Sequence, residues 1–147
     1  MAYVKNILER KGNSVWTIGP DASVRDALTE MAEKVVGALV VVDGTNILGI
    51  FSERDYARQV AKTGSLGLEQ PVRELMSHPV FFARPEQTVE ECMRIMTARH
   101  FRHLPVLNED ELVGIISIGD VVKSLMKEKE MTIRGLENFI AGSSVQH

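Results

Sequence analysis

The chain contains two copies of one segment, because residues 15–55 and residues 80–120 match position by position without a gap. Unrelated segments of this length would share roughly two or three identities, whereas the copies share ten. The identical pairs are Val15/Val80, Pro20/Pro85, Val24/Val89, Met31/Met96, Leu39/Leu104, Val41/Val106, Gly49/Gly114, Ile50/Ile115, Ser52/Ser117 and Asp55/Asp120. A solenoid needs about three or more repeats to bury its stacked faces. We therefore expect the two copies to pack against each other about a pseudo-twofold axis, so that a site in one copy recurs in the other.

Each copy predicts the order strand, helix, strand, strand, helix. The first strand is a short apolar stretch, residues 15–18 or 80–83, followed by a proline that cannot continue a β-ladder. Amphipathic helices follow, with capping boxes expected from Ser23 and Asp26 in one copy and from Thr88 and Glu91 in the other. Hairpins are then predicted over 38–42 with 47–52 and over 104–107 with 112–117, and closing helices begin near Arg54 and Gly119. A right-handed crossover would make the first two strands parallel.

The segments outside the copies complete a single module over residues 1–147. A small helix is expected over residues 4–11, ended by Gly12. We assign residues 13–62 and 78–127 to the two repeats, residues 63–77 to a linker with a short apolar segment, and residues 128–147 to a C-terminal helix and tail. The last helix is longer than one repeat needs, so we expect it to pack on the other copy or on a second subunit.

Composition favours one soluble globular domain, with 44% apolar and 25% charged residues. The formal net charge of -3 does not favour binding to nucleic acid or to an anionic membrane, both of which attract positively charged proteins. No apolar run approaches the roughly 18 residues that span a bilayer, and we expect a cytoplasmic protein. The single cysteine, Cys92, excludes an internal disulfide and is expected to be a small buried side chain.

The sequence argues against an enzyme. It has no Walker loop, no G-x-G-x-x-G motif and no H-E-x-x-H motif. His100 and His103 are three residues apart, yet they lie on either side of a predicted helix end, which does not favour a zinc site. We predict neither catalytic residues nor a metal site.

The most informative repeated feature is a Ser three residues before an Asp, at the point where a strand turns into a helix. The pairs are Ser52 with Asp55 and Ser117 with Asp120. In one interpretation the hydroxyl caps the helix and the carboxylate meets the positive end of the helix dipole. In another, the carboxylate accepts hydrogen bonds from a ribose diol, while the hydroxyl and the free amides of the helix hold a phosphate. Both interpretations can hold together.

The copies differ in their cations, which favours a bound anion. Gly37 and Ala38 in the first copy correspond to Arg102 and His103 in the second, whereas Arg54 corresponds to a glycine. If the copies face each other, these cations border a cleft that contains both Ser/Asp pairs, and a phosphate is a suitable counter-ion. The alternative is ordinary solvated surface charge.

At these residues the chain resembles the cystathionine-β-synthase (CBS) domain family, as a stand-alone pair of CBS motifs that forms one Bateman module. The matching segments are VRDALTEMAEK and VEECMRIMTAR, GALVVVDG and RHLPVLNE, and GIFSERDYAR and GIISIGDVV. The resemblance implies an α/β (α+β) fold with two pseudo-twofold-related repeats packed sheet to sheet. It also implies a non-enzymatic sensor of adenosine-containing ligands such as AMP, ADP, ATP, NAD or S-adenosylmethionine, with no catalytic cofactor.

The resemblance implies two unequal sites, each built from both repeats. Site one combines Ser52 and Asp55 with Val80, Phe81, Arg102 and His103. Site two combines Ser117 and Asp120 with Thr17, Ala38 and Arg54, and Arg102 can reach either site. Gly119 leaves site one without a cation that is often found there. The resemblance further implies a homodimer, and any effector protein must be a separate chain. The alternative function is a protein-interaction module with a vestigial nucleotide cleft.

Overall fold

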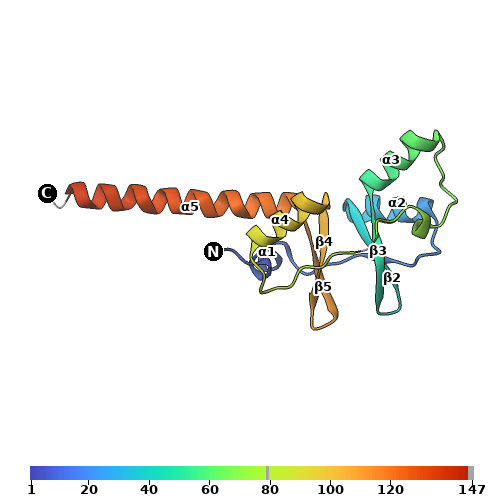
Figure 1. The fold of residues 1–147 in the computed structure, drawn as a ribbon, viewed down its shortest axis with the longest axis horizontal. Helices are drawn as coiled ribbons and strands as arrows, with labels where there is room; N and C mark the ends of the chain where they lie inside the picture. The colour runs from blue at the N-terminus through green and yellow to red at the C-terminus, as the bar shows by residue number, and fades with distance from the viewer. Residues whose placement is uncertain (79, 146–147) are drawn as a thin grey trace. The chain divides into compact units, whose positions relative to one another are not determined.

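The computed structural model describes residues 1–78 and 80–145, and in this part of the chain the order of elements is the one predicted from the repeat, except that the second repeat lacks its first strand. The elements are α1 (Val4–Lys11), β1 (Thr17–Ile18), α2 (Val24–Lys34), β2 (Ala38–Asp43), β3 (Asn46–Ser52), α3 (Glu53–Thr63), the 3₁₀ helix η1 (Val72–Glu74), α4 (Val89–Arg99), β4 (His103–Asn108), β5 (Glu111–Ser117) and α5 (Ile118–Val145) (Figure 1). The chain forms two compact units. We call Ser14–Phe82 the central unit, and Met1–Asn13 with Ala83–His147 the terminal unit.

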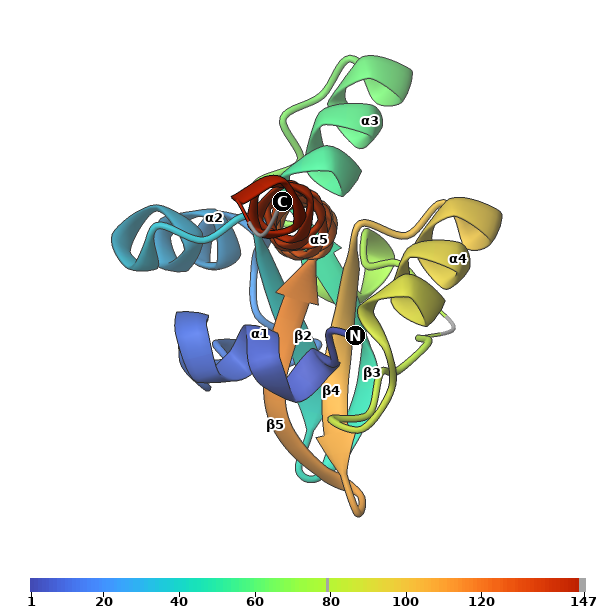
Figure 2. The same ribbon diagram turned by 90° about the vertical axis from the view of Figure 1, so that its left-hand side faces the viewer.

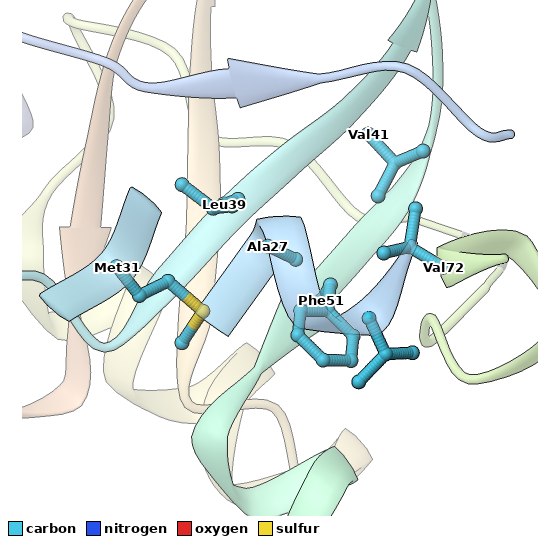
Figure 3. Close-up of a cluster of buried hydrophobic side chains, with 7 residues drawn as sticks. Ala27, Met31, Leu39, Val41, Phe51 and Val72 are labelled. Atoms are coloured by element: carbon cyan, nitrogen blue, oxygen red, sulfur yellow. The ribbon is translucent and has the colours of Figure 1, made fainter. Parts of the chain in front are cut away.

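The central unit is built on a three-stranded sheet in the order β1-β2-β3. β1 and β2 are parallel, as predicted, because α2 forms the crossover between them, and β2 and β3 form an antiparallel hairpin. Figure 3 shows the core of this unit, a cluster of buried side chains that includes Met31 of α2, Leu39 of β2 and Phe51 of β3. Burying side chains of this size stabilises the unit by about 1.5–3 kcal/mol each.

The terminal unit repeats the hairpin with β4 and β5, in the same register as β2 and β3. α1 contacts β5, and α5 packs against both α4 and β5 (Figure 2). The strand predicted over residues 80–83 is wrong. Only Ala83 reaches the hairpin, through an isolated parallel bridge to Val106. Pro85 follows two residues later and has no N–H to donate, so the ladder ends there.

The helix caps differ in one respect from the prediction. Ser23 and Thr88 accept hydrogen bonds from the backbone N–H groups of Asp26 and Glu91, at 3.0 and 3.1 Å. Among the described hydrogen bonds, however, neither carboxylate bonds back to the N–H of its capping residue, so these caps are half of a capping box. The complete reciprocal pattern occurs instead at the Ser/Asp pairs of the closing helices.

The segments that precede the two repeats dock in the same way, although the spacing that aligns the repeats does not align these segments. We call residues 2–12 and 70–77 the first and second lead-in segments, and they correspond when Val4 is aligned with Val72. The N–H of Val4 donates to the carbonyl of Gln87 at 2.9 Å, and the N–H of Val72 donates to the carbonyl of Ala22 at 2.9 Å. The segment before the first repeat therefore completes the second repeat, and the segment before the second repeat completes the first.

The lead-in segments fit closely against two glycines, one in each hairpin. A Cβ atom on Gly114 would lie 2.6 Å from the Leu8 side chain, and one on Gly49 would lie 2.7 Å from both the Met76 sulfur and the Ser77 carbonyl oxygen. Leu8 and Met76 are equivalent in the alignment of the lead-in segments. The identical glycines Gly49 and Gly114 are thus needed for close approach, rather than for an unusual backbone angle.

Helix α5 extends well beyond the body of its unit, as the sequence predicted. Val121 and Ser124 near its start are buried, and α5 contacts α1 and α4 there. Further along, large apolar side chains are exposed to solvent in this chain, namely Met126, Met131, Ile133, Leu136, Phe139 and Ile140. Packing of this part of α5 against a second subunit stays a prediction.

The close fit at Gly49 generates the first prediction. Gly49→Ala should lower the free energy of unfolding by about 1–3 kcal/mol, because the added methyl group meets a backbone carbonyl that cannot turn aside. Gly135→Ala is the matched control, since nothing lies within 4 Å of its Cβ position on helix α5. The control should be neutral or stabilising by up to about 1 kcal/mol. Urea unfolding measures both variants, and equal stabilities would contradict the docking of the second lead-in segment.

Candidate functional site

The candidate site of the central unit lies where β3 ends and α3 begins. Ser52 is the N-cap of α3, and its Oγ accepts a hydrogen bond from the N–H of Asp55 at 3.2 Å. In return, Asp55 Oδ2 accepts from the Ser52 N–H at 3.1 Å and from the Ser52 hydroxyl at 2.9 Å. The side chain of Asp55 therefore has one fixed orientation at the N-terminus of a helix, where the helix dipole favours a negative charge.

The second carboxylate oxygen of Asp55 is engaged by the second lead-in segment. The hydroxyl of Ser77 donates to Asp55 Oδ1 at 2.9 Å. The backbone of Ser77 pairs with Ile50 in an antiparallel bridge, with hydrogen bonds of 2.8 and 3.1 Å. Both Asp55 and Ser77 are half-buried, so this carboxylate lies at the surface of the unit and still has lone pairs directed toward solvent.

The terminal unit contains the same arrangement where β5 meets α5. Asp120 Oδ2 accepts from the Ser117 N–H at 2.8 Å, and the Asp120 N–H donates to Ser117 Oγ at 3.1 Å. The first lead-in segment supplies a cation here. The ammonium of Lys11 donates to Asp120 Oδ2 at 2.7 Å and to the carbonyl oxygen of Ile115 at 3.0 Å. This ion pair is the main difference between the two sites.

The surroundings of Asp120 shift its pKa below the ordinary value of 3.8. Burial acts in the opposite direction and is the largest single effect, since it disfavours the charged carboxylate. The hydrogen bonds from Lys11 and Ser117 and the positive charge of Lys11 together outweigh burial. Asp120 is consequently held as a carboxylate that is already paired with a cation.

Some of the other predicted site residues lie beside these pairs within their own units, and others are placed only in the same unit. In the central unit, Ala38 is paired with Ser52 across the hairpin, Thr17 begins β1, and Arg54 is exposed in the first turn of α3. Val80 and Phe81, also in this unit, are half-buried.

In the terminal unit, His103 is paired with Ser117 across the hairpin. The carbonyl of Arg102 accepts a hydrogen bond from the N–H of Ile118 at 2.8 Å, so Arg102 lies beside the start of α5. The predicted sites combine residues of both units, and those combinations stay a prediction.

Lys11 and Ser77 were not predicted from the sequence. Both belong to lead-in segments, which do not follow the spacing that aligns the two repeats. A signal was available, because the apolar residues Val4, Ile7 and Leu8 align with Val72, Leu75 and Met76. The two lead-in segments share a single identical residue, however. Their alignment also gives no sign that the first segment docks on the second repeat and the second segment on the first.

The remaining chemistry-bearing residues do not add a site. Cys92 is fully buried, as predicted, and burial, with a smaller effect of Glu91, raises the pKa of its thiol to about 11. A buried neutral thiol is a poor nucleophile. Among the described residues, no cluster of His, Cys, Asp and Glu has the geometry to hold a metal ion, and no helix is long and apolar enough to cross a membrane.

Comparison with known proteins supports the repeat and its fold. The family model described as CBS domain matches residues 4–62 and 72–127, so each match includes a lead-in segment. The CBS domain-containing protein CBSX3, mitochondrial, of Arabidopsis thaliana is 32% identical over 149 residues, which cover 95% of this chain and 72% of that protein.

Two solved structures extend the comparison. A CBS-domain containing protein from Agrobacterium tumefaciens has a TM-score of 0.79 and 44% identity, covering 84% of this chain and 98% of that one. The structure of CBSX2 in complex with AMP has a TM-score of 0.65 and 27% identity, covering 88% of this chain and 99% of that one. Both structures match this chain over most of its length, which supports a fold of two CBS repeats.

The ion pair at Asp120 generates the second prediction. Because the folded-state pKa is depressed, Asp120 stabilises the fold above its unfolded-state pKa, and this contribution is lost as the pH falls through the folded-state value. Asp120→Asn should therefore lower the free energy of unfolding at neutral pH by on the order of 1 kcal/mol. The difference from wild type should shrink below about pH 4. Urea unfolding from neutral to acid pH measures it.

A double-mutant cycle isolates the contribution of Lys11. In a Lys11→Met background, Asp120→Asn should cost less at neutral pH, because the ion pair is already lost. A cost that is the same in both backgrounds, or one that does not change with pH, would contradict the assignment.

Proposed function

The chain belongs to the CBS domain family, and on that premise we propose that it is a non-catalytic regulatory module that binds an adenosine-containing ligand and transmits its occupancy to a separate effector protein. The ligand class covers AMP, ADP, ATP, NAD and S-adenosylmethionine. A ligand that binds one conformation of the module more tightly than another shifts the module toward that conformation, and a partner protein can respond to the shift.

The observation that carries this proposal is the equivalent placement of two carboxylates, Asp55 and Asp120. Each is fixed by a reciprocal bond to a serine at the N-terminus of a helix. A carboxylate accepts two hydrogen bonds from neighbouring hydroxyl groups, which is how a ribose diol is recognised. The amides of the first helical turn and the serine hydroxyl suit a phosphate beside it. The AMP complex of the related CBSX2 supports this ligand class.

The proposed sites combine the two repeats. Site one uses Ser52 and Asp55 with Val80, Phe81, Arg102 and His103, and site two uses Ser117 and Asp120 with Thr17, Ala38 and Arg54. Arg102 and Arg54 are the cations proposed to meet phosphate groups, and both are exposed at the start of, or beside, a closing helix. Because one repeat supplies Arg102 and the other Arg54, we propose that the two sites bind ligand with different affinities.

We also propose that the module is a homodimer. Its support is the apolar part of α5, where Leu136, Phe139 and Ile140 are more than half exposed in the single chain. The same surface favours the alternative function, a protein-interaction module with a vestigial cleft. The two functions differ in whether an adenosine ligand changes the properties of the protein.

Calorimetry on carboxylate variants tests the proposed function. Wild type should show two binding events with an adenosine nucleotide, and Asp55→Asn and Asp120→Asn should each remove one, because the amide replaces one of the two acceptor oxygens with an NH2 donor that cannot accept from a ribose hydroxyl. Asp26→Asn is the matched control, since Asp26 occupies the same position of a serine-capped helix and its side chain lies on α2. It should leave both events unchanged.

A thermal-shift panel gives an independent result. A ligand at a hundredfold excess over its dissociation constant adds about 2.7 kcal/mol of stability, which raises the unfolding temperature by several degrees. No shift with any of the five ligands at millimolar concentration would favour the interaction module. Two-site binding retained in both carboxylate variants would remove the ribose assignment.

A further inference from the structure

The two repeats present the same pair of acceptors to their lead-in segments, but the donors differ in charge. In the central unit, the N–H of Ser77 donates to the Ile50 carbonyl at 2.8 Å, and its hydroxyl donates to Asp55 at 2.9 Å. In the terminal unit, the equivalent carbonyl and carboxylate both accept from the ammonium of Lys11, at 3.0 and 2.7 Å. The ammonium of Lys11 therefore donates to both acceptors in the terminal unit, whereas the neutral N–H and hydroxyl of Ser77 donate to the equivalent acceptors in the central unit.

The position of Lys11 is determined by the fold of the terminal unit. Lys11 is the last residue of α1, which is held against β5 by Leu8 over Gly114 and is ended by the bond from the Gly12 N–H to the Leu8 carbonyl at 2.8 Å. The ion pair itself is open to solvent, because the Lys11 and Asp120 side chains are 34% and 25% exposed. An ion pair with this exposure is readily opened, because solvent screens the attraction between its charges.

From this difference we infer that Lys11 makes the Asp120 site selective for phosphorylated adenosine ligands over the uncharged nucleoside. The inference rests on the proposed function, in which Asp120 accepts hydrogen bonds from ribose hydroxyls. It adds a specificity-determining residue, Lys11, that lies outside both repeated segments, and it assigns different ligand preferences to the two carboxylates.

The mechanism is a competition for the carboxylate of Asp120. Among the described hydrogen bonds, Oδ2 accepts from Lys11 and from the Ser117 N–H, and Oδ1 accepts none. A ribose diol that bonds to both carboxylate oxygens must therefore displace the ammonium from Oδ2. An uncharged nucleoside offers the displaced ammonium no partner, and the ion pair is lost without replacement. A phosphate group is a stronger hydrogen-bonding partner for the ammonium. The flexible four-carbon stem of lysine lets the ammonium move from the carboxylate to the phosphate.

The Asp55 site has no equivalent cost. Ser77 presents a neutral hydroxyl, which can rotate to donate elsewhere or to accept a hydrogen bond from the ligand. Displacing it leaves no charge without a partner. The Asp55 site is therefore expected to discriminate less between a nucleoside and its phosphate than the Asp120 site does.

The test measures AMP and adenosine binding by calorimetry at each site separately. Asp55→Asn leaves the Asp120 site, and Asp120→Asn leaves the Asp55 site. In the Asp55→Asn background, Lys11→Met should weaken AMP binding roughly tenfold, through loss of a charged hydrogen bond, and strengthen adenosine binding up to about threefold, through loss of the competitor. The ratio of the two affinities is the quantity that a purely structural role of Lys11 would not change.

Three variants serve as controls. Lys5→Met removes the same charge from the same helix, at a lysine that lies over the Tyr3 ring, 5.6 Å from its centroid, and it should leave the affinity ratio unchanged. Lys11→Arg keeps the cation and should retain the preference for AMP even if Lys11→Met proves unstable. Ser77→Ala in the Asp120→Asn background should change the ratio at the Asp55 site by less than about twofold, because it removes a neutral donor.

The outcomes separate this inference from the proposed function. Nucleotide binding at the Asp120 site with an AMP-to-adenosine ratio that Lys11→Met does not change would overturn the role of Lys11 and leave the proposed function in place. Binding of neither compound to the wild type at millimolar concentration would overturn both. A ratio that falls in Lys11→Met, is retained in Lys11→Arg and is insensitive to Lys5→Met would support the inference.

Discussion

The reciprocal hydrogen bonds between a serine and an aspartate at the strand-to-helix junction determine where the chemistry of this protein lies. At Ser52 and Asp55, and again at Ser117 and Asp120, two backbone N–H groups that a helix start leaves unpaired are satisfied by two side chains. The same bonds hold each carboxylate in one orientation. The helix cap and the candidate ribose acceptor are therefore one structure, and the two interpretations of the sequence are compatible at the level of individual atoms.

The lead-in segments complete that structure, because each junction has a further donor that its own repeat does not supply. Ser77 reaches Asp55 and Lys11 reaches Asp120, from segments that follow or precede the repeats along the chain. The docking depends on Gly49 and Gly114, whose missing Cβ atoms leave room for Met76 and Leu8. Close packing of Leu8 over Gly114 therefore helps to place the ammonium of Lys11 beside the carboxylate of Asp120.

The hairpins of the two repeats are equal in register, and the charges around their carboxylates differ. β2–β3 and β4–β5 have the same register, including the irregularity that follows Val41 and Val106. Their cations differ, since Arg54 belongs to one repeat, Arg102 to the other, and Lys11 has the neutral Ser77 as its counterpart. Duplication of a unit supplies two similar frames, and substitution at a few positions gives their carboxylates different charged neighbours.

The sequence by itself determined the helices, both hairpins and the location of both Ser/Asp pairs, because hydrophobic periodicity, capping residues and turns depend on neighbours within a few residues. The apolar residues 80–83 predicted a strand that the structure does not contain, since an apolar stretch does not reveal whether a partner strand is within reach. Only the tertiary structure decided which donors meet the carboxylates. Lys11 and Asp120 are separated by 109 residues, and their pairing depends on how α1 docks on β5 rather than on any local pattern. Packing brings the two charges together, and it makes the second carboxylate different from the first.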